Sequence, residues 1–114
     1  MFQPKISIIT ICYNSAQTIE KTIQSIVEQD YTNREYIIVD GLSTDNTLSI
    51  VNKYSKQIDV IISEKDKGIS DAFNKGITRA SGEIVVLINS DDILLPDALS
   101  KVAQAWVPGV DIFS

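Results

Sequence analysis

Short apolar runs rich in β-branched residues alternate along the chain with stretches of helical periodicity. The runs cover residues 6–11, 35–39, 59–62 and 83–88, and each predicts a β-strand. The last of them is apolar at every interior position, which is typical of a parallel strand covered on both faces. A fifth run begins near Val110. The pattern therefore predicts a buried sheet.

The segments between these runs predict helices. In the first segment, apolar residues recur at i, i+4, i+7 and i+8, which predicts a helix over residues 16–29. Asn14 or Ser15 is expected to cap it, and Asp45 to cap a second helix. Gly82 is expected to end a third helix, and Pro96 to occupy the first position of a fourth. This alternation predicts an α/β fold with a Rossmann-like, open, mainly parallel sheet flanked by helices.

Composition narrows the classes of function. The 114 residues include 44% hydrophobic and 22% charged residues, and the net charge is -5 without a dense basic run. Nucleic acid is therefore not expected as a partner. The longest aliphatic run, residues 84–88, is far shorter than the ~18 residues that cross a bilayer. These features indicate one globular unit that does not span a membrane.

Cysteine and histidine usage narrows the chemistry. Cys12 is the single cysteine and lies in an apolar run, so an internal disulfide is excluded and a reducing compartment is favoured. The chain has no histidine, which excludes Ser-His-Asp and Cys-His catalysis and a His-ligated zinc within these residues. Carboxylate, amide and hydroxyl oxygens are left as the candidate functional groups.

Polar residues follow each predicted strand, where ligands of open α/β sheets bind. The segments are Cys12-Tyr13-Asn14, Asp40-Gly41, Ser63-Glu64-Lys65-Asp66 and Asn89-Ser90-Asp91-Asp92. Each aspartate taken singly can be a turn residue. Together they predict one edge of clustered carboxylates, whose mutual repulsion a divalent cation would relieve. Hard oxygen ligands suit Mg2+ or Mn2+, which commonly bridge phosphate oxygens.

Four ordered blocks carry a resemblance to a known family. They are ISIIT with YN within residues 6–14, YIIVDGLSTDNT at 36–47, EKDKGISDAFNKGI at 64–77, and ASGE with NSDD within 80–92. The sequence resembles the N-terminal half of family 2 glycosyltransferases, which are inverting enzymes with the GT-A fold that use nucleotide-sugar donors. The last two blocks look most like bacterial enzymes that build surface polysaccharide.

The resemblance implies a set of nucleotide-side residues. Thr10, Tyr13 and Asn14 would line the nucleotide pocket, and Asp40 would bind the base by a hydrogen bond. Asp66 matches another acidic position on the nucleotide side. These roles are expectations from the family, transferred position by position.

A second set matches the family's Asp-x-Asp motif. Asn89, Ser90 and Asp91 occupy its three positions, so Asn89 replaces the first acid. An amide can bind a ribose hydroxyl but is a weaker metal ligand, so Asn89 and Ser90 are expected on the nucleotide-sugar side. Asp91, together with Asp92, is expected to bind Mg2+ or Mn2+. The metal would stabilise the charge that develops on the departing nucleoside diphosphate.

The resemblance also implies what surrounds these residues. Residues 1–114 are expected to be the nucleotide-sugar-binding part of the domain, with the acceptor part and the general base after Ser114. The expected donor is a nucleoside diphosphate sugar, foremost a UDP-sugar, and the acceptor is a saccharide or a lipid-linked molecule. We expect a cytoplasmic location at the inner face of the membrane, compatible with peripheral membrane association and with self-association. By itself the chain is expected to transfer sugar poorly.

Other classes fit less well. A receiver-type signalling domain needs an acidic pair after the first strand, where Cys12-Tyr13-Asn14 stands. A dinucleotide-binding oxidoreductase needs Gly-x-Gly-x-x-Gly there. The alternative that stays open is a module that binds nucleotide-sugars without turnover.

Overall fold

Four parallel strands form the sheet of this chain, and a computed structural model describes residues 3–106 of it. The strands are β1 (Ile6–Cys12), β2 (Arg34–Asp40), β3 (Val60–Ser63) and β4 (Ile84–Asn89), in the order β3-β2-β1-β4. Each ends one residue later than the apolar pattern predicts, because the backbone of a residue with a polar or thiol side chain continues the pairing. Cys12 pairs with Asp40, and Asp40 pairs with Ser63. The predicted run near Val110 lies outside the described residues.

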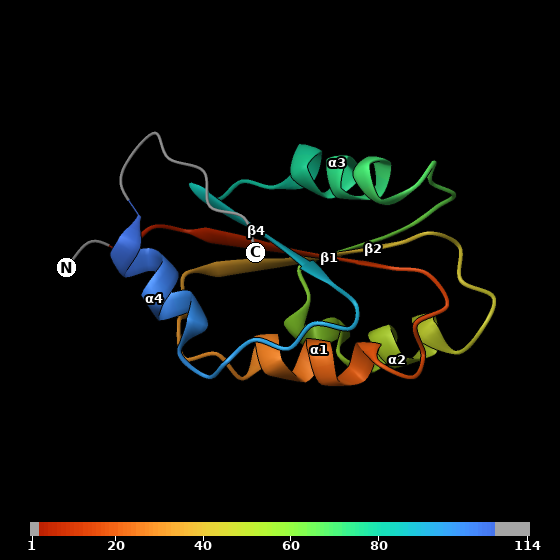
Figure 1. The fold of residues 1–114 in the computed structure, drawn as a ribbon, viewed down its shortest axis with the longest axis horizontal. Coiled ribbons are helices and arrows are strands. Elements are labelled where there is room, and N and C mark those ends of the chain that lie inside the picture. Colours follow the sequence, from red (N-terminus) through yellow and green to blue (C-terminus); the bar gives the residue numbers. More distant parts are fainter. Residues whose placement is uncertain (1–2, 107–114) are drawn as a thin grey trace.

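Helices cover both faces of the sheet, as predicted (Figure 1). They are α1 (Ile19–Val27), α2 (Thr47–Lys53), α3 (Ile69–Arg79) and α4 (Ala98–Ala105), with a 3-10 turn at Ser55–Gln57. Helix α3 lies on one face of the sheet, and α1, α2 and α4 lie on the other. None of these helices has the length and apolar character needed to cross a bilayer, as far as the structure describes the chain.

Helix starts differ from the prediction. Helix α1 begins at Ile19 because the Ser15 carbonyl accepts the amides of Thr18 and Ile19 in a preceding turn. The predicted capping by Asn14 or Ser15 is therefore wrong. Helix α4 likewise begins at Ala98, two residues after Pro96. In both cases a polar turn occupies residues that the periodicity assigned to the helix.

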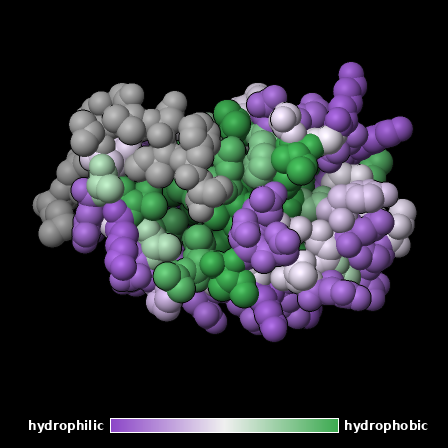
Figure 2. Space-filling view, viewed as in Figure 1, coloured by the Kyte–Doolittle hydropathy of each residue, from purple (hydrophilic) through white to green (hydrophobic). Residues whose placement is uncertain are grey.

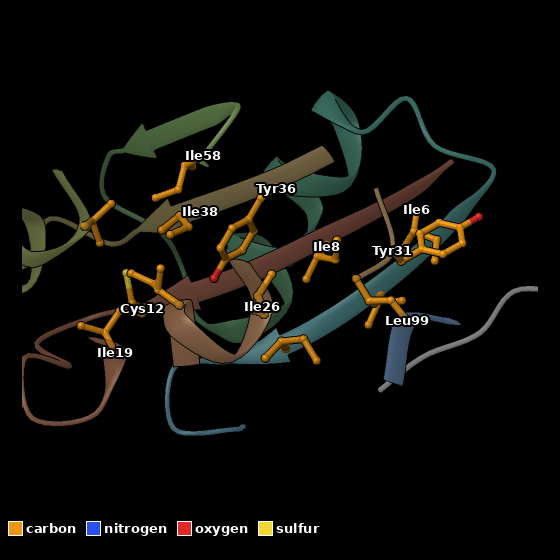
Figure 3. Packing of buried hydrophobic residues seen from close by; sticks show 14 of the residues in the cluster. Ile6, Ile8, Cys12, Ile19, Ile26, Tyr31, Tyr36, Ile38, Ile58 and Leu99 are labelled. Atoms are coloured by element: carbon orange, nitrogen blue, oxygen red, sulfur yellow. The ribbon is translucent and has the colours of Figure 1, made fainter. Parts of the chain in front are cut away.

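Alternation along β1 builds two cores. Its even-numbered apolar residues pack against α1, α2 and α4, and its odd-numbered ones pack beneath α3. The first core is the larger, and Figure 3 shows Tyr36 of β2 within it among Ile8, Ile26 and Ile38. Full burial of an isoleucine side chain such as that of Ile8 contributes about 1.5–3 kcal/mol to folding stability. This two-sided burial fixes the carboxyl ends of the strands relative to one another.

Candidate functional site

A groove of about 910 Å³, lined by both polar and apolar groups, opens at the carboxyl ends of β1 and β4 and reaches the start of α3. Six of the predicted site residues line it, namely Tyr13, Asn14, Asp66, Asn89, Ser90 and Asp91. These six residues come from three of the four blocks, and Asp45 of the second block also lines the groove. In the space-filling view, apolar residues gather in the middle of the face shown, and hydrophilic ones lie mainly on the right side and along the lower edge (Figure 2).

A smaller hollow of about 360 Å³ shares Tyr13 and Asp66 with the groove. Gly41, Leu42 and Lys65 complete its lining. The Tyr13 side chain is 59% exposed, so its ring is available to a ligand in either space. A flat aromatic face next to polar groups suits a base, whereas the larger groove suits phosphates and a sugar.

Asp66 is positioned by a backbone hydrogen bond and by the lack of a side chain at Gly41. Its Oδ1 accepts the amide of Gly68 at 3.0 Å, and Gly68 has a φ of 123°, which favours glycine. A Cβ placed on Gly41 would lie 2.6 Å from Asp66 Oδ2. The glycine that follows β2 therefore lets the carboxylate approach the end of the strand.

Asn14 fastens the loop after β2 to the loop after β1. Its backbone adopts a left-handed φ of 49°, and its Oδ1 accepts the Thr44 amide at 2.7 Å and the Asp45 amide at 3.4 Å. Its own amide donates to Ser43 Oγ at 2.8 Å. Asn14 lines the groove and also orders its wall. Asparagine tolerates this backbone region better than most residues.

Asp45 and Thr47 complete this connection. The Ser15 amide donates to Thr47 Oγ1 at 2.8 Å, and the Ala16 amide donates to Asp45 Oδ2 at 3.2 Å. Asp45 Oδ1 accepts the Thr47 hydroxyl and amide at 2.5 and 2.9 Å. The hydroxyl bond is the main cause that lowers the pKa of Asp45. The hydrogen bond from the Thr47 amide involves the first residue of α2, which is close to the capping predicted for Asp45.

Asp91 and Asp92 have different surroundings. Asp91 is exposed and lines the groove. Asp92 Oδ2 accepts the Asn89 amide at 3.2 Å, so this carboxylate closes the turn, and Asp92 is not part of the groove lining. Ser90 is hydrogen-bonded to Ser15 through their hydroxyls at 2.8 Å. The turn thus presents Asp91 to the groove.

The donor set around Asp91 fits a hard divalent cation that is held jointly with a ligand. No group of three carboxylate or thiolate side chains converges within residues 3–106, so these residues do not form a complete metal cage. Mg2+ typically binds one or two carboxylates and takes its other oxygens from phosphates and water. Asp91 with the Asn89 amide and the Ser90 hydroxyl in the same groove suits that arrangement.

Thr10 and Asp40 lie outside the groove lining and are fully buried. The Thr10 hydroxyl is bonded to the Tyr36 hydroxyl at 2.9 Å inside the larger core. Asp40 Oδ2 accepts the Ser43 amide and the Ser63 hydroxyl, both at 3.0 Å. The structure gives both residues internal partners, and their contact with a nucleotide stays a prediction.

Cys12 lies where an apolar run predicts it, at the buried end of β1. Burial raises the pKa of its thiol, and the nearby carboxylate of Asp40 raises it further. Its Sγ lies 3.6 Å from Asp40 Oδ1. The thiol is therefore neutral and packs in the core, as the sequence suggests.

Several residues of the site escaped the sequence analysis. Ser15, Ser43 and Thr47 connect the loops, and Gly68 and Ile69 line the groove. Serine and threonine in loops carry no distinctive signal, because they are equally common in solvated turns. Only the resemblance, whose second block includes Ser43 and Thr47, marked that segment as part of a site.

Comparisons with known proteins agree with this geometry. The family model for glycosyl transferase family 2 matches residues 7–114. A Bacillus subtilis glycosyltransferase assigned to teichuronic acid biosynthesis, TuaG, is 39% identical over 103 residues, which are 88% of this chain and 41% of that protein. The chain thus spans less than half of that relative.

Two solved structures share the fold. S. aureus TarS 1-349 in complex with UDP-GlcNAc has a TM-score of 0.82 and 31% identity, covering 88% of this chain and 30% of that chain. The mannosyltransferase PcManGT from Pyrobaculum calidifontis, in complex with GDP-Man and Mn2+, has a TM-score of 0.79 and 31% identity, covering 92% and 32%. The predicted α/β fold class is confirmed.

Proposed function

The chain belongs to glycosyl transferase family 2, and on this basis we propose that it binds a nucleoside diphosphate sugar in the groove for transfer to an acceptor hydroxyl with inversion. The observation that carries the proposal is the groove itself, in which exposed Tyr13 and Asp91 and half-buried Asp66 come together at the carboxyl edge of the sheet. UDP-sugars are the first donors to test, since TarS has been solved with UDP-GlcNAc.

The residues divide between the two ends of the donor. The hollow beside Tyr13 and Asp66 would receive the base, and Asp91 would face the diphosphate. Mg2+ or Mn2+ held between Asp91 and the diphosphate would offset the negative charge on the leaving group. Asn89 and Ser90, in the same turn, would contact the ribose or sugar hydroxyls.

Inversion requires the acceptor hydroxyl to attack the anomeric carbon from the face opposite the diphosphate. A positioned base that removes the proton contributes typically ~10²–10⁴-fold in rate. We assign no described carboxylate to that role and place the base and the acceptor site after Ser114. The chain is then the nucleotide-sugar-binding part of the transferase.

The wider setting follows from the same proposal. A role in bacterial surface polysaccharide synthesis is supported by the similarity to TuaG. The acceptor would be a saccharide or a lipid-linked molecule, reached from the cytoplasm at the inner face of the membrane. A binding module without turnover is the alternative, and a sugar-transfer assay run beside a binding assay separates the two.

The test is calorimetric titration of the chain with UDP, UDP-GlcNAc and GDP-mannose, in Mn2+ and in EDTA. We expect tighter binding in Mn2+ and loss of that gain in Asp91→Ala. Asp30→Ala is a matched control, because the Asp30 carboxylate lies at the surface away from the groove, where it accepts a hydrogen bond from the Ser100 hydroxyl. Equal affinity in Mn2+ and EDTA would rule out the metal role, and absence of binding by every donor would rule out the proposal.

A further inference from the structure

The segment between β4 and α4 runs along α1, on the side of the sheet away from α3 (Figure 1). Helix α1 and the residues just after it meet this segment with three polar residues, Thr22, Ser25 and Gln29, at spacings of three and four. Gln29 lies two residues beyond the end of the helix. These three residues are called the α1 stripe here. They lie beside the apolar positions that bury the helix, so their polar groups need partners.

Thr22 holds the turn that carries Asp91. Its hydroxyl lies 2.9 Å from the Ser90 carbonyl oxygen and 2.6 Å from the Asp92 carbonyl oxygen, and it donates toward both. These two carbonyls belong to the residues on either side of Asp91. Thr22 is itself fully buried, so water cannot replace its hydroxyl without opening the packing.

The rest of the stripe binds the chain that follows. Ser25 Oγ accepts the Leu94 amide at 3.1 Å. The Gln29 amide group donates to the Leu95 carbonyl at 2.7 Å and accepts the Leu99 amide at 3.1 Å. All these partners are backbone atoms, of Leu94 and Leu95 in the segment and of Leu99 in the first turn of α4. The stripe therefore fixes the path of this segment whatever its side chains are.

Hydroxyls at these positions are not needed to fill the core. Valine has nearly the shape of threonine and loses no free energy by leaving water, whereas a buried hydroxyl is tolerated only when it is bonded. The distinctive effect of Thr22 is to fix the two carbonyls that flank Asp91. A carboxylate that binds a cation gains affinity when its backbone is held in place.

We propose that Thr22 is a positioning residue that holds Asp91 ready for the divalent cation, with Ser25 and Gln29 supporting the same segment. The inference rests on the proposed function, because it assumes that Asp91 faces a cation bound with a nucleoside diphosphate. Thr22 does not touch the ligand. It acts through the backbone of the turn.

The test compares Thr22→Val with Thr22→Ser, which keeps the hydroxyl. Thr78→Val is the matched control, because the Thr78 hydroxyl bonds a carbonyl within α3 and does not contact the turn. UDP binding is titrated at increasing Mn2+ and in EDTA. We expect Thr22→Val to raise the half-saturating Mn2+ concentration about tenfold, because removal of a group that orients a metal ligand typically weakens metal binding by at least this factor. The UDP affinity of Thr22→Val in EDTA should change less than about twofold. In Thr22→Ser and Thr78→Val, the half-saturating Mn2+ concentration and the UDP affinity in EDTA should also change less than about twofold.

Hydrogen exchange of the metal-free protein supplies a second readout. The Asp92 amide donates to the Asn89 carbonyl, and the Leu94 amide donates to Ser25, so both should exchange faster in Thr22→Val. Unchanged exchange and an unchanged Mn2+ midpoint in a folded Thr22→Val would overturn the inference. If Thr22→Val does not fold, Ser25→Ala carries the same test, and its Leu94 amide and Mn2+ midpoint decide.

Failure of the underlying function looks different. If the unsubstituted chain binds UDP equally in Mn2+ and EDTA, the cation role of Asp91 fails, and the positioning of Asp91 for a cation fails with it. Faster exchange in Thr22→Val would then show only that Thr22 holds the turn. A merely structural effect of Thr22 would lower the melting temperature and weaken UDP binding equally with and without metal.

Discussion

The Asp66 carboxylate occupies the space that a side chain at Gly41 would fill. A Cβ on Gly41 would lie 2.6 Å from Asp66 Oδ2 and 3.5 Å from the Tyr13 ring. Both neighbours line the hollow assigned to the base. The absence of a side chain at Gly41 is thus a condition for the shape of the site.

Gly41→Ala should weaken nucleotide binding with little loss of stability. The added methyl group displaces Asp66, whereas Gly41 does not have a positive φ and tolerates alanine. We expect a loss of about 1 kcal/mol of binding free energy, or a roughly fivefold rise in the Kd of UDP. Calorimetry in Mn2+ measures it.

Gly76→Ala is the contrasting control for that variant. Its Cβ would lie 2.5 Å from Cγ2 of Ile9, beneath α3 and away from the groove. Overpacking of this kind costs about 1–3 kcal/mol of unfolding free energy. UDP affinity per folded molecule should stay unchanged. If Gly41→Ala behaved in the same way, the binding role of the Asp66 contact would be wrong.

Asp40→Ala should lower stability. The variant removes the buried carboxylate that accepts the Ser43 amide and the Ser63 hydroxyl, and loss of hydrogen bonds to a charged group costs about 1.5–3 kcal/mol. Urea denaturation measures the loss, and exposed Asp30→Ala should stay within about 0.5 kcal/mol. A stable Asp40→Ala with greatly weakened UDP binding would instead favour the base contact implied by the family.

Acid should weaken the connection between the loops through Asp45. Its pKa is lowered in the folded chain, chiefly by the Thr47 hydroxyl. A lowered pKa means that the contribution of Asp45 to stability is present above its unfolded value of about 3.9 and is lost as pH falls through the folded value. The difference in melting temperature between the unsubstituted chain and Asp45→Asn should therefore shrink as pH falls below about 4. A constant difference across this range would show that the charge of Asp45 is not involved.

Sequence patterns predicted the sheet well because buried strands are rich in β-branched apolar residues. Strand β1, buried at every residue, and strand β4, buried at alternate residues, both follow such runs. Helix starts were predicted less well, because the periodicity does not reveal that Ser15 closes a turn before Ile19. Strands and helix starts differ in this respect because residue type indicates burial, whereas turns depend on hydrogen bonds between backbone atoms.

The site was predicted in its location but not in its internal organisation. Polar residues after parallel strands were expected at one edge, and Asp66 and Asp91 do line one groove. The family resemblance placed Asp40 and Thr10 there too, and the structure shows both side chains buried and hydrogen-bonded within the chain, outside the groove lining. A pattern shows which strand end carries a carboxylate, but the direction of the carboxylate depends on neighbours from other loops.

Side chains of α1 and of Gln29 bind the backbone of the segment after Asp91, and this has an evolutionary consequence. Exposed residues of that segment, such as Ile93 and Leu95, can be exchanged without removing any bond made by Thr22, Ser25 or Gln29. The segment can thus accumulate substitutions that recognise new partners while the geometry at Asp91 is inherited intact. The side chains of the segment are thus free to vary, while its backbone atoms make the bonds that hold the turn at Asp91.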